Sequence, residues 1–429
     1  MAERLNKLLP KLISEHQNSF TPGREIADSI ILVSEVIHTM HKEKMSGIAV
    51  KLDVEKAYDH VIWSFLVCVL DRLGFPSAWI ECIKQCISTV KFSILVNGNV
   101  CGFFPATNGL RQGGPLSPSL FVLMNEVLGK LIQKRHVRGV WKGIRVHEQL
   151  DAITHSQLAD DTMVFGEATL TEAKTIMETL HLYSESSGQI MNKEKSQLFI
   201  FNTNKQTQSR ISRLMGIKVA ELPLNMSCFK LPAAAGKKLD NLLRKFVWDN
   251  AKDTNRIPLI SWDTMCLQKE SGGVGLQNIA LDAKLTWKMY REPQKLWCSI
   301  FRRKFLDSNE PSRILTIANS IKDSATWNFL WDYRYIITDH ISWQIGNGQS
   351  TKFRYDSWNG EMAICDLIKD PTWIQMVESQ LGSFVNNYFE EDLPNTSHRR
   401  WKRVNLGSSD SNDCIFWCGS KTGEYKVNL

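Results

Sequence analysis

Two adjacent aspartates between two apolar runs constrain the fold of this chain more than any other feature. The runs cover residues 153–159 and 162–165, and Asp160-Asp161 separate them. Successive side chains of a strand point to opposite faces, so one straight strand cannot turn both carboxylates to the same side. A tight turn can, and two like charges this close are best tolerated beside a cation. The pattern therefore predicts a hairpin with two acids at its turn, although a plain solvated turn is the commoner origin of such a pair.

A third acid ends another apolar run earlier in the chain. Residues 48–53 read IAVKLD, which predicts a buried strand with Asp53 at its end. Three carboxylates from two strand ends form a ligand set made only of oxygen, which suits Mg²⁺ better than zinc. Such sites hold two ions, one that activates an attacking 3′-oxygen and one that stabilises a leaving pyrophosphate. Taken alone, Asp53 is equally well an acid at the end of an ordinary strand.

Helical spacing and turn residues predict the elements around these acids. Helices are expected over residues 26–41, 58–73, 118–135 and 170–186, and Asn97-Gly98 predicts a hairpin over 92–104. Helices that alternate with strands, some of them in hairpins, favour an α+β domain in which a small antiparallel sheet is backed by helices. Beyond about residue 205 the strand signals fade, and a helix-rich and then irregular region is expected.

The positive charge of the chain lies in one segment. The net charge is +7 over 429 residues, and residues 230–307 alone contain 15 Lys and Arg against 8 Asp and Glu. Trp248, Trp262, Trp287 and Trp297 are interleaved with these charges. A basic, aromatic-rich face suits a phosphate backbone and stacked bases. A solvated helical face with its tryptophans in the core explains the same pattern equally well.

Membrane and disulfide-rich classes are not indicated. No apolar run approaches the roughly 18 residues that cross a bilayer, and the N-terminal stretch has no small-residue cleavage site. Ten cysteines are scattered without a Cys-x-x-Cys pair or zinc spacing, which favours thiols in a reducing compartment. We therefore expect an intracellular protein, in the nucleus or cytoplasm, with no membrane partner.

Five segments identify a family that the chain resembles. They are HQNSFTPGR (16–24), KLDVEKAYDHV (51–61), NGLRQGGPLSPSLF (108–121), LADDTMVF (158–165) and SGQIMNKEKSQLF (187–199). In this order they resemble the motifs of reverse transcriptases from LINE-type, non-LTR retrotransposons, especially the plant forms. The resemblance implies a right-hand polymerase fold, with fingers and palm over residues 1–205. A basic, Trp-rich thumb remnant or connector would cover 206–310, and a region leading to a zinc-binding domain would cover 311–429.

The resemblance also implies an activity and its catalytic residues. The activity would be RNA-directed DNA polymerisation, with an RNA template, a DNA primer and deoxynucleoside triphosphates as partners and no defined protein partner. Asp53, Asp160 and Asp161 would be catalytic and would hold two Mg²⁺ ions, with Mn²⁺ as an alternative. Lys195 would stabilise or protonate the pyrophosphate leaving group.

Four further residues are candidates for substrate binding through the same resemblance. Tyr58 would screen against a ribose 2′-OH, or else be an aromatic residue of a helix packed in the palm. Gln112 and Gly113 would contact the templating base or the incoming nucleotide, because a glycine lets backbone approach a ligand closely. Arg24 would bind the triphosphate, whereas a simple turn at the start of a helix is the competing interpretation of TPGR.

The sequence also departs from the family pattern. It begins at a point that resembles the middle of the fingers, so no endonuclease domain is expected. After residues 216–224 it resembles a much later region, so much of the thumb is expected to be missing, and it stops before the zinc-binding domain. The family often has Asp at the position of Gly114 and an apolar residue at that of Gln157. The alternative is therefore an impaired retroelement remnant that at most binds nucleic acid, although the three intact aspartates favour an enzyme.

Overall fold

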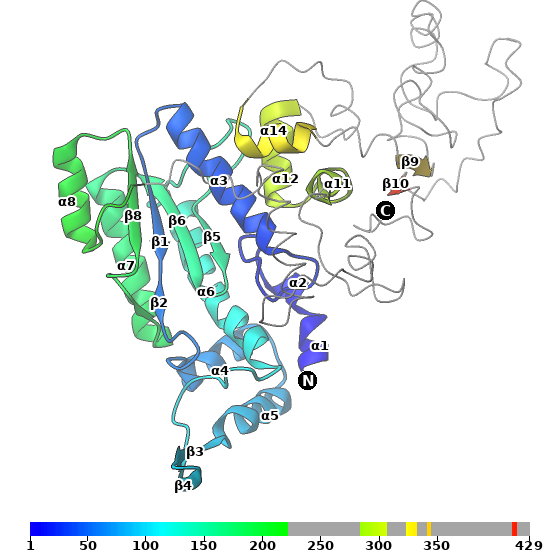
Figure 1. The fold of residues 1–429 in the computed structure, drawn as a ribbon, viewed down its shortest axis with the longest axis vertical. Coiled ribbons are helices and arrows are strands. Elements are labelled where there is room, and N and C mark those ends of the chain that lie inside the picture. Colours follow the sequence, from blue (N-terminus) through cyan, green and yellow to red (C-terminus); the bar gives the residue numbers. More distant parts are fainter. Residues whose placement is uncertain (222–283, 307–322, 333–340, 345–413, 418–429) are drawn as a thin grey trace, which may run out of the picture. The chain divides into compact units, whose positions relative to one another are not determined.

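The computed structural model describes residues 1–221, 284–306, 323–332, 341–344 and 414–417 (Figure 1). The chain forms two compact units, Met1–Met226 and Ser227–Leu429. The first unit contains all five motifs. It continues beyond the expected boundary at residue 205, because helix α8 (Lys205–Met215) packs against helix α7 (Leu170–Ser187).

A four-stranded antiparallel sheet forms the centre of the first unit (Figure 1). In spatial order its strands are β5 (His155–Leu158), β6 (Asp161–Glu167), β1 (Gly47–Leu52) and β8 (Gln197–Phe201). Strand β1 pairs with β6 on one side and with β8 on the other. The expected α+β class, with a small antiparallel sheet backed by helices, is therefore confirmed.

Apolar residues at alternate positions attach this sheet to its helices. Ile48, Val50 and Leu52 of β1 are buried in one cluster with residues of α6 (Ser117–Val137), α7 and α8. Burial of each such side chain contributes about 1.5–3 kcal/mol. Because side chains alternate along a strand, Lys51 and the following Asp53 take the positions of the opposite face.

A second cluster lies at the other end of α6. It joins α1 (Ala2–Asn6), α2 (Leu9–Leu12), α4 (Trp63–Arg72) and α5 (Ser77–Ser88) to the first half of α6. Leu120 and Leu123 of α6 belong to this cluster, whereas Leu128 and Ile132 belong to the cluster beneath the sheet. Helix α6 therefore connects the two cores, and this explains why it is apolar over most of its surface.

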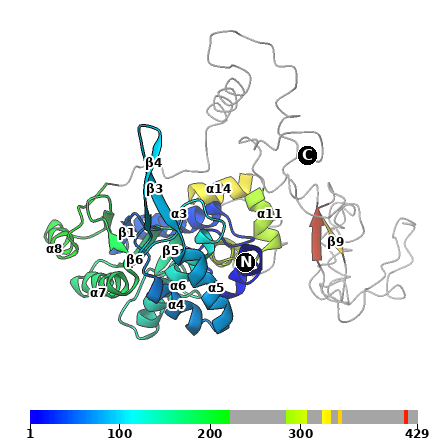
Figure 2. The same cartoon turned by 90° about the horizontal axis from the view of Figure 1, so that it is seen from below.

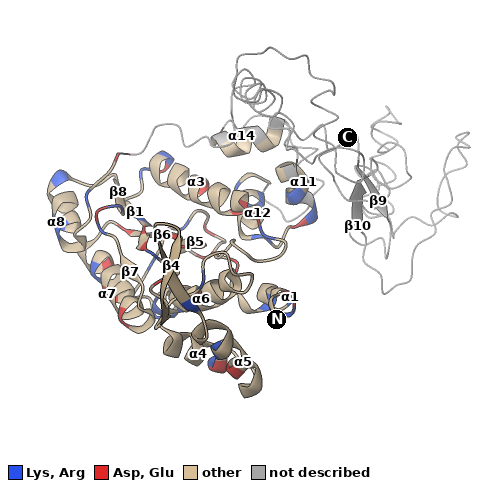
Figure 3. Cartoon of the chain, turned by 60° about the horizontal axis from the view of Figure 1, so that its bottom comes forward, with Lys and Arg blue, Asp and Glu red and all other residues tan. Residues whose placement is uncertain are grey.

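The remaining elements of the first unit are one long helix and two pairs of short antiparallel strands. Helix α3 covers Ile26–Lys42, β2 (Val54–Glu55) pairs with β7 (Ile190–Met191), and β3 (Lys91–Val96) pairs with β4 (Asn99–Pro105). Every residue of β3 and β4 is exposed, and Figure 2 shows this hairpin projecting from the unit. Acidic and basic positions are interspersed along α5 and α7 (Figure 3).

The structure corrects one expected element. The helix expected over residues 58–73 begins only at Trp63, and residues 56–60 form a turn in which Lys56 has a φ of +41°. Tyr58 therefore belongs to a turn and not to the first turn of a helix. The backbone of residues 58–62 bonds to other segments of the chain. Tyr58 O accepts from Leu110 N, and Val61 O accepts from Gly109 N. Ile62 N donates to Ser187 O, so the helix begins only after this residue.

The described part of the second unit is mostly helical. It contains α11 (Lys284–Arg291), α12 (Leu296–Phe301), the π-helix η2 (Arg302–Leu306), α14 (Ala325–Asp332) and a strand pair, β9 (Ile341–Gln344) with β10 (Cys414–Trp417). Trp287 and Trp297 are buried. For these two tryptophans the core interpretation is therefore correct, and they present no face to a stacked base.

Several expectations fall on residues that the structure does not describe. Two of the four tryptophans, Trp248 and Trp262, lie outside the described residues. The break in the family pattern was expected after residues 216–224. Only 216–221 of that segment are described, so the break itself lies outside the described residues. Within the described ranges, no helix is long and apolar enough to cross a membrane. Cys68, Cys82, Cys86, Cys101 and Cys298 are free thiols.

Candidate active site

The strand register brings the three aspartates to one end of the sheet. Leu52, the last residue of β1, faces Thr162 of β6. Asp53 follows β1, and Asp161 is the first residue of β6, so both lie at the same end of the sheet. Leu158 and Asp161 close the β5–β6 hairpin, and Asp160 is the second residue of its two-residue turn. Residues that face each other across antiparallel strands have Cα atoms about 4.5–5.5 Å apart. Acids that are distant in sequence therefore become neighbours.

The charges around these acids are few. Asp161 Oδ1 lies 3.7 Å from Lys51 Nζ, and both side chains are about half exposed. Among the described residues no ion pair involves Asp53 or Asp160. No group of three or more His, Cys, Asp or Glu within the described ranges has the geometry of a metal site. The donor set nevertheless fits a hard divalent cation, because it offers only carboxylate oxygens and two of them lack a cationic partner.

The turn that carries Asp160 is strained and held from both sides. Ala159 has a φ of +56°, a left-handed conformation that costs a residue with a Cβ atom about 1–2 kcal/mol. Gln17 Oε1 accepts a hydrogen bond from Ala159 N at 3.2 Å, and Asn125 Nδ2 donates to Ala159 O at 2.8 Å. Such bonds contribute about 0.5–1.5 kcal/mol each, so the two together offset the strain.

Sequence reasoning missed both side chains that hold this turn. Gln17 lies inside the first motif, but the only site residue that this motif predicted was Arg24. Asn125 is a polar residue inside the apolar stretch of α6, and a buried polar residue in such a stretch usually has a specific partner. That signal was available in the sequence for Asn125, whereas nothing local identifies the partner of Gln17.

The other half of the site is fastened through the backbone of Asp53. Asp53 N donates to Ser196 Oγ at 3.1 Å, and Asn192 N donates to Asp53 O at 2.9 Å. Ser196 Oγ also donates to Asn192 O at 2.7 Å. These bonds tie the turn over residues 192–196 to the end of β1. Lys195 is an exposed residue of this turn, so the fifth motif is brought to Asp53.

A loop of the third motif lies on the turn that contains Tyr58. Gly109 N donates to Val61 O at 2.8 Å, and Leu110 N donates to Tyr58 O at 2.7 Å. Gly109 has a φ of +86°, and a Cβ atom there would lie 2.7 Å from Asp59 O, so only glycine fits. Gln112 Nε2 donates to Asp59 Oδ1 at 3.2 Å. The structure thus brings Gln112 beside the turn of Tyr58.

Tyr58 itself is half-buried and stacks on an aromatic residue of α6. The ring centroids of Tyr58 and Phe121 are 4.9 Å apart, with an interplanar angle of 12°. Burial first, and the charge of Asp160 second, raise the pKa of Tyr58, which places its phenol near the catalytic turn. A packing role is therefore evident, and selection against a ribose stays a prediction. Gly113, the other loop candidate, is exposed beside Gln112.

Arg24 has partners within the first motif. Its guanidinium donates to the carbonyl oxygens of Ile13 at 2.8 Å and Gln17 at 2.6 Å, and also to that of Ser14. These bonds fix the segment that carries Gln17. Contact between Arg24 and a triphosphate stays a prediction, and the structure gives this side chain a role in folding the first motif.

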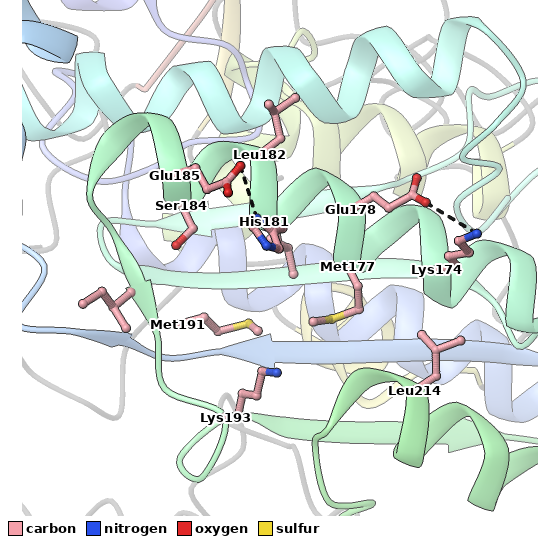
Figure 4. A pocket seen from close by; sticks show the side chains of 12 residues that line it. Lys174, Met177, Glu178, His181, Leu182, Ser184, Glu185, Met191, Lys193 and Leu214 are labelled. Carbon is pink, nitrogen blue, oxygen red and sulfur yellow. Dashed lines mark ion pairs between the residues drawn. The ribbon is translucent and has the colours of Figure 1, made fainter.

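Two hollows lie near α7. A cavity of about 40 Å³ beneath the sheet is lined by Asp160, Thr162 and Tyr183, among others. A groove of about 600 Å³ follows α7 toward α8 and contains the ion pairs Lys174–Glu178 and His181–Glu185 (Figure 4). None of the three aspartates lines this groove, so it is separate from the candidate site.

Comparison with known families agrees with this fold. Residues 1–219 match the family model described as reverse transcriptase (RNA-dependent DNA polymerase). This match covers half of the chain, and the chain therefore belongs to the reverse transcriptase family. Members of this family generally use divalent metal ions.

Relatives narrow the resemblance to transposable elements. The chain is 26% identical over 193 residues to the transposon TX1 uncharacterized 149 kDa protein of Xenopus laevis, covering 45% of this chain and 14% of that protein. It is 27% identical over 185 residues to the retrovirus-related Pol polyprotein from type-2 retrotransposable element R2DM of Drosophila melanogaster, covering 43% and 16%. An uncharacterized mitochondrial protein of Arabidopsis thaliana is 44% identical over 68 residues, covering 16% and 56%.

These matches confirm the relationship to non-LTR retrotransposon reverse transcriptases that the five motifs indicated. The chain spans only 14% of the Xenopus protein and 16% of the Drosophila protein.

Proposed function

We propose that this chain is an RNA-directed DNA polymerase that adds deoxynucleotides to a primer 3′-OH. The observation that carries the proposal is the register of β1 against the β5–β6 hairpin, in which the end of β1 at Leu52 faces Thr162, the residue after Asp161. Membership of the reverse transcriptase family supports the reaction class. The names of the relatives, a transposon protein and a Pol polyprotein of a retrotransposable element, support an origin of this chain in a transposable element. Its substrates would be an RNA template and a DNA primer.

The three aspartates would hold two Mg²⁺ ions, or Mn²⁺ in their place. When bound, the ions would activate the primer 3′-oxygen and stabilise the pyrophosphate. Lys51 would then lose its ion pair with Asp161. This loss costs little, because exposed ion pairs contribute only about 0–1 kcal/mol to stability. Lys195, on the turn tied to Asp53, would donate a proton to the leaving pyrophosphate.

The incoming deoxynucleoside triphosphate would lie against the turn of Tyr58 and the loop of the third motif. Gln112 would contact the base pair that forms, and Gly113 would allow close approach of the backbone. Tyr58 would stand beneath the sugar, supported by its stack on Phe121. Arg24 is the weakest member of this set, because three carbonyl groups already accept from its guanidinium.

A second candidate function is nucleic-acid binding with little synthesis. It is favoured by the absence, within the described ranges, of a ready-made group of three acids for a metal ion. Under this alternative, the pairing of Lys51 with Asp161 would persist in the presence of Mg²⁺.

The test is primer extension by the purified full chain on poly(rA) annealed to oligo(dT), with Mg²⁺ and then Mn²⁺. Asp160→Asn is expected to lower the rate at least about 100-fold, because several kcal/mol of charge stabilisation depend on the ions. The matched control is Asp71→Asn, an exposed acid at the end of α4, which should extend like the parent chain. Duplex binding without extension by the parent chain would favour the second candidate and reject the first.

A further inference from the structure

We propose that Gln17 and Asn125 are positioning residues for the polymerase reaction, which hold the left-handed conformation of Ala159 and so set Asp160 at the metal-binding edge. The inference rests on the proposed function, because it assigns a purpose to the geometry of the catalytic turn. Neither side chain contacts a reacting atom. Both act on Asp160 through the backbone of the residue before it.

The two backbone polar groups of Ala159 are held by side chains from different parts of the chain. Gln17 precedes α3 and Asn125 lies in the middle of α6. One accepts from the amide of Ala159 and the other donates to its carbonyl. The amide belongs to the peptide unit before the Cα atom of Ala159, and the carbonyl belongs to the unit after it. Because both units are held, the φ and ψ angles of Ala159 are fixed, and Asp160 leaves the turn in one direction.

The orientation of each clamping amide is itself determined. Gln17 Oε1 also accepts from Ser19 N at 3.0 Å, and two N–H donors on one oxygen exclude the flipped amide. Asn125 Oδ1 accepts from Tyr183 Oη at 3.2 Å. Burial raises the pKa of Tyr183, so the phenol remains a donor throughout the neutral range. Both amides are buried, so water does not compete for them.

A third amide joins the two clamps. Gln157 is fully buried, and its Nε2 donates to Asn125 O at 3.3 Å. Its backbone N donates to His16 O at 2.7 Å, and its backbone O accepts from Asn18 N at 3.1 Å. Gln157 thus ties the segment around Gln17 to α6. The apolar residue that the family often has here would lack the side-chain bond, so the connection is a property of this chain.

Loss of a clamp should alter the metal-binding step more than nucleotide binding. When the peptide of Ala159 is released, the turn relaxes to right-handed conformations and the Asp160 carboxylate leaves its place. The nucleotide would lie against Tyr58 and the loop of the third motif, which neither clamp contacts. The expected signature is therefore a lower kcat and a higher Mg²⁺ requirement with an unchanged KM for the deoxynucleotide.

The central variant is Asn125→Leu, which keeps the number and the branching of the side-chain heavy atoms. It removes the donor to Ala159 O and the acceptor of the Tyr183 hydroxyl. We expect kcat to fall about tenfold, equal to about 1.4 kcal/mol, with the nucleotide KM within about twofold of the parent value. Adding Ala159→Gly should recover part of the loss, because glycine adopts a positive φ without strain. Gln17→Met should behave like Asn125→Leu.

A matched control separates positioning from general loss of stability. Thr179 is buried in α7, and its Oγ1 donates to Thr175 O at 2.7 Å. Thr179→Val removes a buried hydrogen bond away from the turn, so it should lower the thermal midpoint and leave the Mg²⁺ requirement unchanged. An Asn125→Leu chain with the parent Mg²⁺ requirement would overturn the proposal. So would a Thr179→Val chain that raises the requirement equally.

A second readout does not depend on synthesis. Mn²⁺ binding to the full chain is measured by electron paramagnetic resonance, with Asp160→Asn as the reference for loss of a ligand. Asn125→Leu should weaken Mn²⁺ binding about tenfold, and Thr179→Val should not. If the parent chain binds Mn²⁺ but synthesises nothing, weaker binding by Asn125→Leu still supports the positioning role while the proposed function fails. Equal Mn²⁺ affinity in the parent and Asn125→Leu chains would reject the role by itself.

Discussion

Mild acid is expected to loosen the strand that leads into the catalytic turn. His155 is buried in β5, and its ring stacks on that of His16 with centroids 4.3 Å apart. Burial lowers the pKa of His16, and burial together with the nearby charges of His16 and Lys130 lowers that of His155 well below its ordinary value. Just below the ordinary histidine pKa, these two side chains therefore stay neutral in the folded chain and bind protons in the unfolded chain.

The sign and the size of the effect follow from this difference. The unfolded histidine pKa is about 6.5, so the contribution of His155 to stability is complete above that pH and is lost as the pH falls below it. Each excluded proton costs about 1.36 kcal/mol per pH unit in that range. At pH 5.5 His155 alone therefore lowers the free energy of unfolding by about 1.4 kcal/mol. Burial raises the pKa of Glu126, which acts in the opposite direction nearer pH 4.5.

The assay is hydrogen–deuterium exchange of the full chain, which reports the local opening free energy of peptides that cover residues 153–165. Between pH 6.5 and 5.5 this free energy should fall by about 1 kcal/mol from His155 alone, because the unfolded histidine is already half protonated at pH 6.5. The comparison is made after correction for the intrinsic exchange rate. His155→Asn should remove most of the slope. His181→Asn is the matched control, because that side chain is 71% exposed beside Glu185. The same slope in the parent and His155→Asn chains would refute the reasoning.

Two further predictions concern the remaining candidates. Tyr58→Val should raise ribonucleotide incorporation in primer extension and keep deoxynucleotide use. Tyr58→Phe keeps the stack on Phe121 and should not raise ribonucleotide incorporation. If an active Tyr58→Val chain discriminates against ribonucleotides as the parent does, Tyr58 has a packing role only. Arg24→Met should lower stability by about 1.5–3 kcal/mol in urea unfolding, because hydrogen bonds from a charged donor are lost. A deoxynucleotide KM raised more than about tenfold by Arg24→Met at full stability would instead support contact with the triphosphate.

Local patterns were sufficient for much of the fold. Alternation and apolar runs predicted β1 and the β5–β6 hairpin, and helical spacing predicted α3, α6 and α7, because these signals come from residues close in sequence. The start of α4 was predicted too early, since apolar spacing does not reveal that the backbone of residues 58–62 bonds to distant segments of the chain. The place of β8 beside β1 was not predicted, because pairing between distant strands leaves no local signal.

The candidate site was predictable in its residue types and not in its supports. Three acids at strand ends indicate a cation site wherever the strands meet, and the structure brings those ends together. Arg24 illustrates the limit. A lysine or arginine just before a helix predicts an anion-binding site. In the structure the Arg24 guanidinium instead donates to backbone carbonyl groups. The path of the segment that carries these carbonyl groups depends on tertiary structure, so the sequence alone does not reveal them. Gln17 and Asn125 escaped notice for the same reason, since each is interpretable only through Ala159.

The hydrogen bonds also explain why five distant motifs belong to one site. The first motif holds the fourth, through Gln17 and Ala159. The fifth motif is bonded to the second, because Ser196 Oγ accepts from Asp53 N. The third motif is also bonded to the second, because Gly109 N donates to Val61 O. Each bond involves a backbone group, so it fixes the path of a turn and leaves the outward side chain available for chemistry. A change at Gln17 or Ser196 is therefore expected to act on a proposed catalytic residue of another motif, Asp160 or Asp53.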